Sequence, residues 1–231
     1  MTEQEQAAEH LKVIRSLMER STVYRAISWQ AALFGGGLAI CLAAALFGRT
    51  RMILAADGEA GPVMDDPTWI LIWLVALVVT GGVNVLLISR KSKRDGHAFF
   101  SPGLKHAMRA IAPPMAAGGL LGIGHILWLG GTVAGGAAIW VICYGLALLA
   151  TQGFAPKSMA RLGWAMLLAG AAAYGVIWTL HGPSAAIPAG TAMQTANLIM
   201  GTCFGVFHLV YGCGVARLGK EEARETGADT E

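Results

Sequence analysis

Six long apolar runs dominate the sequence, and each is almost free of charged residues. Each run is close to the roughly 20 residues that an α-helix needs to cross the hydrocarbon core of a bilayer. Only 13% of the 231 residues are charged, whereas ordinary soluble domains have about a quarter. The sequence therefore predicts an all-α polytopic membrane protein with six transmembrane helices arranged as three helical hairpins. The predicted spans are 28–47, 69–88, 115–133, 137–152, 163–180 and 192–213.

The six runs also set the domain organisation. Residues 28–216 form the predicted six-helix transmembrane domain, which leaves little chain for a soluble domain. A charged cytoplasmic tail is expected over 217–231. The first 20 residues hold seven charged side chains and no apolar core of the signal type. We therefore expect no cleaved signal peptide, and the first span is expected to act as the insertion signal.

Residues 1–27 are predicted to form an amphipathic helix on the cytoplasmic side. Their apolar side chains recur at intervals of three and four residues, which places them on one helical face. Two interpretations remain open. The helix can lie among the lipid headgroups, or its segment 7–27 can dock onto a protein partner or a second copy of the chain. The stripe is too short for a coiled coil and consists of Leu11, Ile14, Leu17, Met18, Ser21 and Tyr24.

The basic residues predict the orientation. Of the 17 Lys and Arg residues, 15 lie in the two tails and in the loops 89–114 and 153–162, and only Arg49 and Arg51 lie elsewhere. Because basic residues concentrate on the cytoplasmic side, both termini are expected in the cytoplasm, with the chain in the inner membrane of a bacterial cell. The longest basic loop, 89–114, is expected to contact anionic headgroups. Its basic residues are Arg90, Lys91, Lys93, Arg94, Lys105 and Arg109.

Prolines indicate where two of the spans begin. Pro67 precedes Trp69, an arrangement that suits a helix start with an aromatic side chain at the membrane interface. Pro113 and Pro114 are expected to open the third span, because proline is tolerated in the first turn of a helix.

The last span carries polar and small residues at helical spacing, which predicts that they share a face turned toward other helices. They are Asn197, Gly201, Gly205, His208 and Gly212. A similar face on the third span combines Gly118 and Gly122 with His125. The uncharged polar side chains of the spans are candidates for a cavity lining or for contacts between helices: Asn84, His125, Tyr174, Gln194, Asn197, His208 and Tyr211.

Several kinds of chemistry lack the residues that they need. No Asp, Glu, Lys or Arg lies inside a predicted span, although ion-coupled pumps usually hold such a residue there. No metalloprotease motif of the His-Glu-x-x-His type occurs, and the four cysteines show no Cys-x-x-Cys spacing. We therefore expect neither an enzyme nor a metal site. The bilayer is the expected partner, with no role for nucleic acid.

Three functions fit the remaining pattern. The first is a small transporter or channel-like protein for a neutral or weakly polar solute, lined by the uncharged polar residues. The second is a regulatory, sensory or assembly subunit that acts through its N-terminal helix and basic loop. The third is a redox subunit that binds quinone, or haem b between His125 and His208. The two histidines differ in depth by roughly 8 Å at 1.5 Å per residue, so haem is the least favoured.

Overall fold

The computed structural model describes residues 29–58, 61, 63–94, 102–181 and 187–228. The predicted N-terminal amphipathic helix, with its partner segment 7–27, lies outside the described residues. All regular structure in the described ranges is helical. The elements are α2 (Trp29–Asp57), α3 (Asp66–Arg94), α4 (Pro102–Leu127), α5 (Val133–Leu149), α6 (Lys157–His181), α7 (Ala189–Met200), the π-helix η2 (Gly201–Val206) and α8 (Phe207–Ala228). The last three join without a break, so the described chain folds into six helices.

Five of these helices are long and apolar enough to cross a membrane. They span Trp29–Asp57, Asp66–Arg94, Leu104–Leu127, Lys157–Leu180 and Ala189–Leu218. The remaining helix, α5, is apolar but has only 17 residues. Most of α5 is buried by its neighbours, whereas α3 and α4 expose large apolar side chains such as Leu71, Val78 and Leu120. Exposed apolar surface of this extent fits a bilayer and not water, so the fold is that of a membrane protein.

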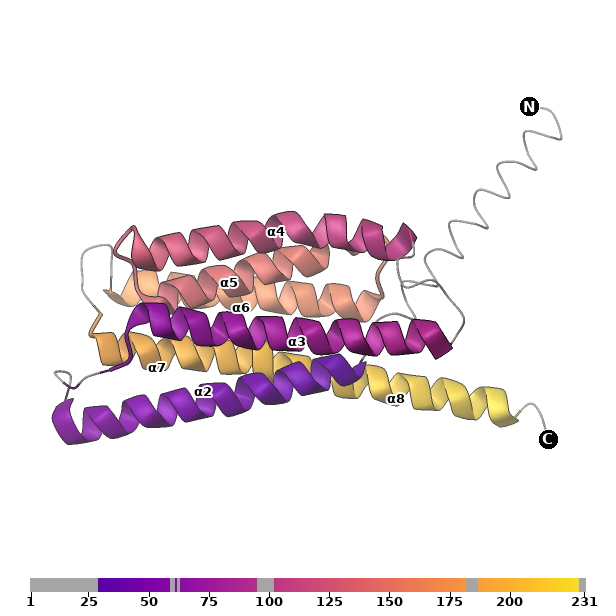
Figure 1. Cartoon of the computed structure of the whole chain (residues 1–231), viewed down its shortest axis with the longest axis horizontal. Helices are drawn as coiled ribbons and strands as arrows, with labels where there is room; N and C mark the ends of the chain where they lie inside the picture. The colour runs from indigo at the N-terminus through magenta and orange to yellow at the C-terminus, as the bar shows by residue number, and fades with distance from the viewer. Residues whose placement is uncertain (1–28, 59–60, 62, 95–101, 182–186, 229–231) are drawn as a thin grey trace, which may run out of the picture.

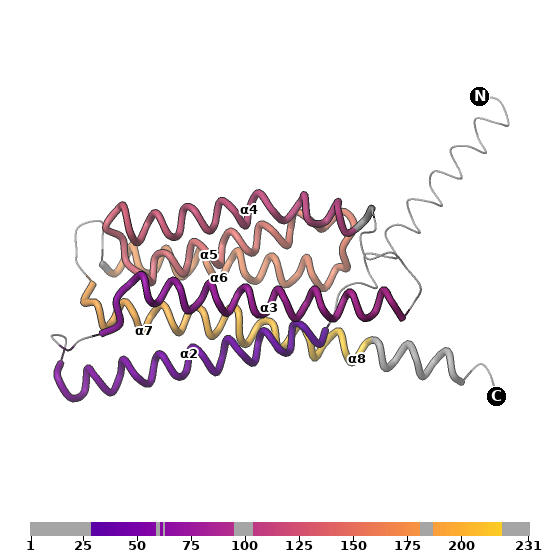
Figure 2. Tube along the Cα trace, viewed as in Figure 1, coloured from indigo at the N-terminus to yellow at the C-terminus, as the bar shows by residue number. Residues whose placement is uncertain are grey.

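The helices form an elongated bundle in which α5 lies between α4 and α6 (Figure 1). On the other side, α2 packs along the continuous helix made by α7, η2 and α8 (Figure 2). Contacts of α3 with α2 and α4 are sparse by comparison. The expected hairpin of α4 and α5 forms, whereas α2 packs mainly on the last helix and not on α3. The first and last helices pair closely, and α4, α5 and α6 form a second group.

Glycines on α5 and α6 explain why these two helices pack so closely. A methyl group placed on Gly145 would lie 2.6 Å from the backbone nitrogen of Leu167 and 2.8 Å from the carbonyl oxygen of Gly163. A methyl group on Gly170 would similarly lie 2.9 Å from the backbone nitrogen of Ile142. Small residues let helix backbones approach one another in membranes, where close packing replaces the hydrophobic effect as the driving force.

The last helix uses its glycines in the same way against α2. Methyl groups on Gly201 and Gly205 would press against Ala43 and Ile40, and one on Gly212 would press against Leu33. Gly36 of α2 in turn faces the carbonyl oxygen of Gly205. The glycines of the predicted stripe therefore do share one face, and α2 covers it.

Helix α4 does not begin at Pro113 and Pro114, as the sequence suggested, but at Pro102. Proline at the first helical position costs little, because the missing N–H has no partner there in any helix. The helix then continues through Pro113 and Pro114. Prolines inside transmembrane helices are tolerated where local adjustments satisfy the freed carbonyl groups. Much of the segment expected to be a basic loop is consequently helical.

Local capping determines where α3 and α5 begin. The carboxylate of Asp65 accepts a hydrogen bond from the backbone N–H of Thr68 at 3.0 Å, as an N-cap does. Hydrogen bonds from the Thr68 side chain and backbone hold the pKa of Asp65 below its ordinary value, so it remains ionised at neutral pH. Thr132 caps α5 by accepting from Gly135 N–H at 3.2 Å, after a turn in which Gly130 has a φ of 66°.

Candidate functional site

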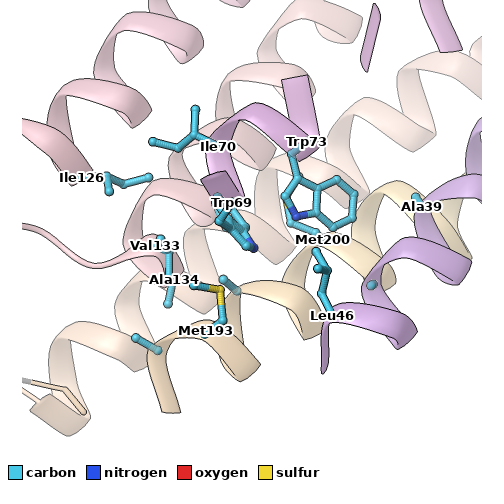
Figure 3. Close-up of a cluster of buried hydrophobic side chains, with 14 residues drawn as sticks. Ala39, Leu46, Trp69, Ile70, Trp73, Ile126, Val133, Ala134, Met193 and Met200 are labelled. Atoms are coloured by element: carbon cyan, nitrogen blue, oxygen red, sulfur yellow. The ribbon is translucent and has the colours of Figure 1, made fainter. Parts of the chain in front are cut away.

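A group of tryptophans forms the centre of the bundle core near the start of α3. Trp69 is completely buried, and Trp73, one turn later, is 4% exposed. Figure 3 shows both side chains projecting from α3 toward α7, where Met193 and Met200 face them. Trp69 is therefore a core residue and not the interfacial aromatic that its place after Pro67 suggested. The first turns of α3 are buried in the bundle, and the sequence pattern could not show this burial.

Trp69 makes a buried hydrogen bond from α3 to a side chain of α7. Its indole N–H donates to the side-chain oxygen of Asn197 at 2.9 Å. Its ring is also stacked on Trp140 of α5, with centroids 5.5 Å apart and planes 14° apart. Trp73 lies at a tilt beside it, with centroids 6.2 Å apart. One tryptophan thus links three helices.

Asn197 is 1% exposed, so its amide is fully removed from solvent and lipid. Because the indole nitrogen of Trp69 can only donate, the atom that faces it must be the amide oxygen. The amide NH₂ group therefore points elsewhere, and it has no hydrogen-bond partner among the described residues. The indole nitrogens of Trp73 and Trp140 are buried and unpartnered in the same sense.

The second polar contact joins α5 to α8. The hydroxyl of Tyr144 lies 2.9 Å from Nε2 of His208. Nδ1 of His208 lies 3.3 Å from the carbonyl oxygen of Cys203, which can only accept. These two distances assign the neutral tautomer in which Nδ1–H donates to Cys203 and Nε2 accepts from Tyr144. His208 is half-buried, and its polar atoms are turned into the bundle.

The π-helix η2 makes this histidine contact available. In a regular α-helix each carbonyl is taken by the residue four positions later, whereas a π-turn changes that pairing. His208 is the second residue after η2, and its ring reaches back to the carbonyl oxygen of Cys203 within η2. Gly201, Gly205 and Gly212 meet α2, whereas His208 meets α5. The predicted single face of the last helix is therefore split in two.

Aromatic rings surround the Tyr144–His208 pair. Phe204 lies edge-on to Tyr144, with centroids 5.1 Å apart, and is stacked against His208 at 6.0 Å. Tyr211, one turn after His208, packs against the same buried cluster, which includes Val141 and Met166. An uncharged, hydrogen-bonded pair within an aromatic cage is the second candidate site of the molecule.

His125 lies apart from His208. Its ring packs against the backbone of Gly131 and Gly135 at the turn between α4 and α5, and its centroid is 6.3 Å from that of Tyr174. Both ring nitrogens of His208 are meanwhile engaged within the chain. This arrangement does not favour the pair of axial ligands that haem b needs. No group of three or more His, Cys, Asp or Glu residues suited to a metal ion occurs in the described part of the chain.

The remaining candidates lie elsewhere in the bundle. Asn84 and Gln194 are both half-buried. Fifteen residues separate Asn84 from Trp69, or about 22 Å along α3 at 1.5 Å per residue. The structure brings Asn197 to Trp69 and His208 to Tyr144, and it places His125 beside Tyr174.

Sequence reasoning missed the partners of these residues. Tyr144 was visible as a tyrosine on the buried helix α5, but only the fold shows that it reaches His208. The burial of Trp69, Trp73 and Trp140 depends on how the helices pack, so the sequence alone did not single out these three residues. The four cysteines are free thiols; Cys143 and Cys203 are buried, whereas Cys41 and Cys213 are exposed.

No protein-family model, curated protein or solved structure matches this chain. What the protein does must therefore be inferred from the arrangement of its own residues.

The Tyr144–His208 hydrogen bond should contribute modestly to stability. Interhelical hydrogen bonds in membranes contribute about 0.6 kcal/mol on average, and at most about 1.7 kcal/mol in one well-studied protein. We expect His208→Leu and Tyr144→Phe each to lower the unfolding free energy slightly, and the double variant to cost less than the sum. Unfolding of the four proteins in detergent would measure the coupling. Strictly additive effects would show that the two side chains do not interact.

Proposed function

We propose that this chain spans the bacterial inner membrane six times, with both termini in the cytoplasm. The distribution of charge over the helices supports this orientation. Basic residues gather at the end of α3 and at the starts of α4 and α6, and those helix ends lie together at one end of the bundle (Figure 1). Arg49 and Arg51 of α2 lie at the opposite end. With 17 residues, α5 is at the lower limit for crossing the hydrocarbon core.

The proposed lipid contacts follow from the same placement. Arg90, Lys91, Lys93 and Arg94 fall in the last two turns of α3, and Lys105 and Arg109 in the first turns of α4. Side chains at these positions can extend along the helices to reach phosphate groups. Anionic lipid of the cytoplasmic leaflet is their proposed partner.

Cysteine labelling tests the orientation. In a cysteine-free variant, single cysteines at Asp57, Gly131 and Gly182 should react with a membrane-impermeant maleimide added to intact cells. Cysteines at Ser92, Ser158 and Lys220 should react only after the membrane is permeabilised. Labelling of a cysteine at position Ser92 in intact cells would show that the proposed orientation is wrong.

Within this topology, the proposed activity is binding and transfer of a small neutral or weakly polar solute. The observation that carries the proposal is the position of η2. It lies in the last helix between Asn197, which bonds to α3, and His208, which bonds to α5. Segments of π-helix occur frequently at functional sites, and here a change in helical pitch would alter both contacts together. The absence of charge from the described core favours an uncharged solute.

Flux measurements on proteoliposomes test this activity. Liposomes containing the protein should equilibrate glycerol or urea faster than protein-free liposomes, as followed by light scattering after an osmotic step. The Tyr144→Phe/His208→Leu variant should reduce this gain while remaining folded. Rates equal to those of protein-free liposomes for a broad panel of neutral solutes, with protein shown to be folded, would refute transport.

A further inference from the structure

The tryptophan cluster holds polar groups whose hydrogen-bonding capacity is unused. The side chains of Asn197 and Trp73 are 1% and 4% exposed. Neither the amide nitrogen of Asn197 nor the indole nitrogen of Trp73 has a hydrogen-bond partner among the described residues. Buried polar atoms are nearly always satisfied in native proteins, so two unsatisfied groups in one cluster require an explanation.

The two groups are close along the helices that carry them. Trp69 bonds directly to Asn197. One turn further along α3 comes Trp73, and one turn further along α7 comes Met200. Helices α3 and α7 run in the same direction and are joined by the Trp69–Asn197 hydrogen bond, and Trp73 and Met200 belong to the same buried cluster (Figure 3). The free N–H groups of Trp73 and Asn197 thus belong to adjacent turns of one interface.

Trp140 contributes to this cluster as a wall and not as a donor. Its ring stacks on Trp69, but its indole nitrogen lies against Gly122 of α4, away from α7. Its unpartnered N–H therefore faces a different interface.

The unused groups are all donors. An indole nitrogen carries a hydrogen and cannot accept, and the oxygen of the Asn197 amide already accepts from Trp69. A water molecule at this place would need acceptors for its two hydrogens, of which the second lone pair of the Asn197 oxygen is one, whereas a carbonyl oxygen needs none. An anion would need its charge compensated, and the core residues around the cluster are apolar: Leu46, Ile70, Met193, Ala196 and Met200. A neutral acceptor satisfies both requirements.

We propose that the interface between Trp73 and Asn197 is the binding site for a neutral, lipid-soluble compound that presents a carbonyl oxygen. The inference rests on the proposed role in solute binding and names its ligand class and place. The carbonyl oxygen accepts from the Trp73 N–H and the Asn197 amide, while the apolar body packs on the indole rings. Within α3 only Trp69, Ile70 and Trp73 are buried, so entry of the compound from the lipid requires this end of α3 to shift.

Two probes that carry the same decyl tail test whether binding requires a carbonyl oxygen as hydrogen-bond acceptor. We use decyl-benzoquinone, which carries two carbonyl oxygens, and decylbenzene, which carries none. Ligand that binds the folded state raises the midpoint of thermal unfolding. The full-length protein in detergent should gain several degrees with decyl-benzoquinone and essentially nothing with decylbenzene.

Two variants test the assigned donors. Trp73→Phe keeps an aromatic ring and removes the N–H, so the shift caused by decyl-benzoquinone should fall by at least half. The paired variant Trp69→Phe/Asn197→Leu removes both partners of the existing bond together with the amide donor, and should abolish the shift. Trp178→Phe, at an exposed tryptophan of α6, is the matched control and should keep the full shift.

The same measurements can overturn the proposal. Equal shifts with both probes, or a full shift in Trp73→Phe, would show that the quinone acts nonspecifically. Stabilisation by sodium nitrate in place of the quinone would assign an anion. A large loss of stability in Trp73→Phe without any probe would indicate that a structural water satisfies the N–H. If decyl-benzoquinone causes no shift but solute flux is measured, only the proposed binding site is wrong. If the shift is observed but no flux is measured, the proposed transport activity is wrong.

Discussion

Trp69→Ala should lower the free energy of unfolding by about 3–5 kcal/mol, the usual cost of truncating a large aromatic side chain in a packed core. Trp69 is completely buried. Its loss would remove the stack on Trp140 and leave the side-chain oxygen of Asn197 without its donor. Since Trp69 and its neighbours hold the start of α3 in the bundle, we also expect this helix end to become accessible.

Reversible unfolding in mixed micelles would measure the change in the free energy of unfolding. Two further variants serve as controls. Trp178→Ala truncates an exposed tryptophan and should change the free energy of unfolding by less than about 0.5 kcal/mol, as surface substitutions usually do. Trp69→Phe should fall between the two, because it keeps the ring stack and loses the N–H. Equal costs for Trp69→Ala and Trp178→Ala would mean that α3 is not anchored through Trp69.

The helical class and the apolar helices could be predicted because both depend on local sequence. A run of about 20 apolar residues has few alternatives to a membrane-spanning helix, and the structure confirms an all-helical fold with five long apolar helices. The residues at which helices begin and end were harder to predict from the sequence. Pro113 and Pro114 resemble a helix start, but the structure begins α4 at Pro102 and tolerates both prolines inside it.

The pairing of helices could not be obtained from the order of the runs. Short connections suggested hairpins, yet α2 packs mainly on the last helix because Gly201, Gly205 and Gly212 offer it a smooth surface. The face containing those glycines was predicted correctly. His208 was placed on the same face, but its ring bonds to Tyr144 of α5 while the glycines meet α2.

The candidate site was predictable only in part. Asn197 and His208 were singled out because polar groups inside a membrane must find partners, and the structure places both in interhelical hydrogen bonds. Their partners, Trp69 and Tyr144, are 128 and 64 residues away in the sequence. Contacts over such separations depend on how whole helices pack, which a single sequence does not state.

Gly145→Ala should be the most damaging single-methyl change at the α5–α6 interface. The added Cβ would lie 2.6 Å from the backbone nitrogen of Leu167 and 2.8 Å from the carbonyl oxygen of Gly163. Both are backbone atoms, so no side-chain rotation can relieve the contact and the two helices must separate. Overpacking of this kind typically costs about 1–3 kcal/mol, and we expect a loss at the upper end of that range.

Gly175→Ala is the matched control, since Gly175 lies on α6 with nothing within 4 Å of the added Cβ. Alanine is favoured over glycine in a helix by up to about 1 kcal/mol. The free energy of unfolding of this variant should therefore equal or slightly exceed that of the unmodified protein. Unchanged stability in Gly145→Ala would mean that α5 and α6 do not approach closely at this glycine.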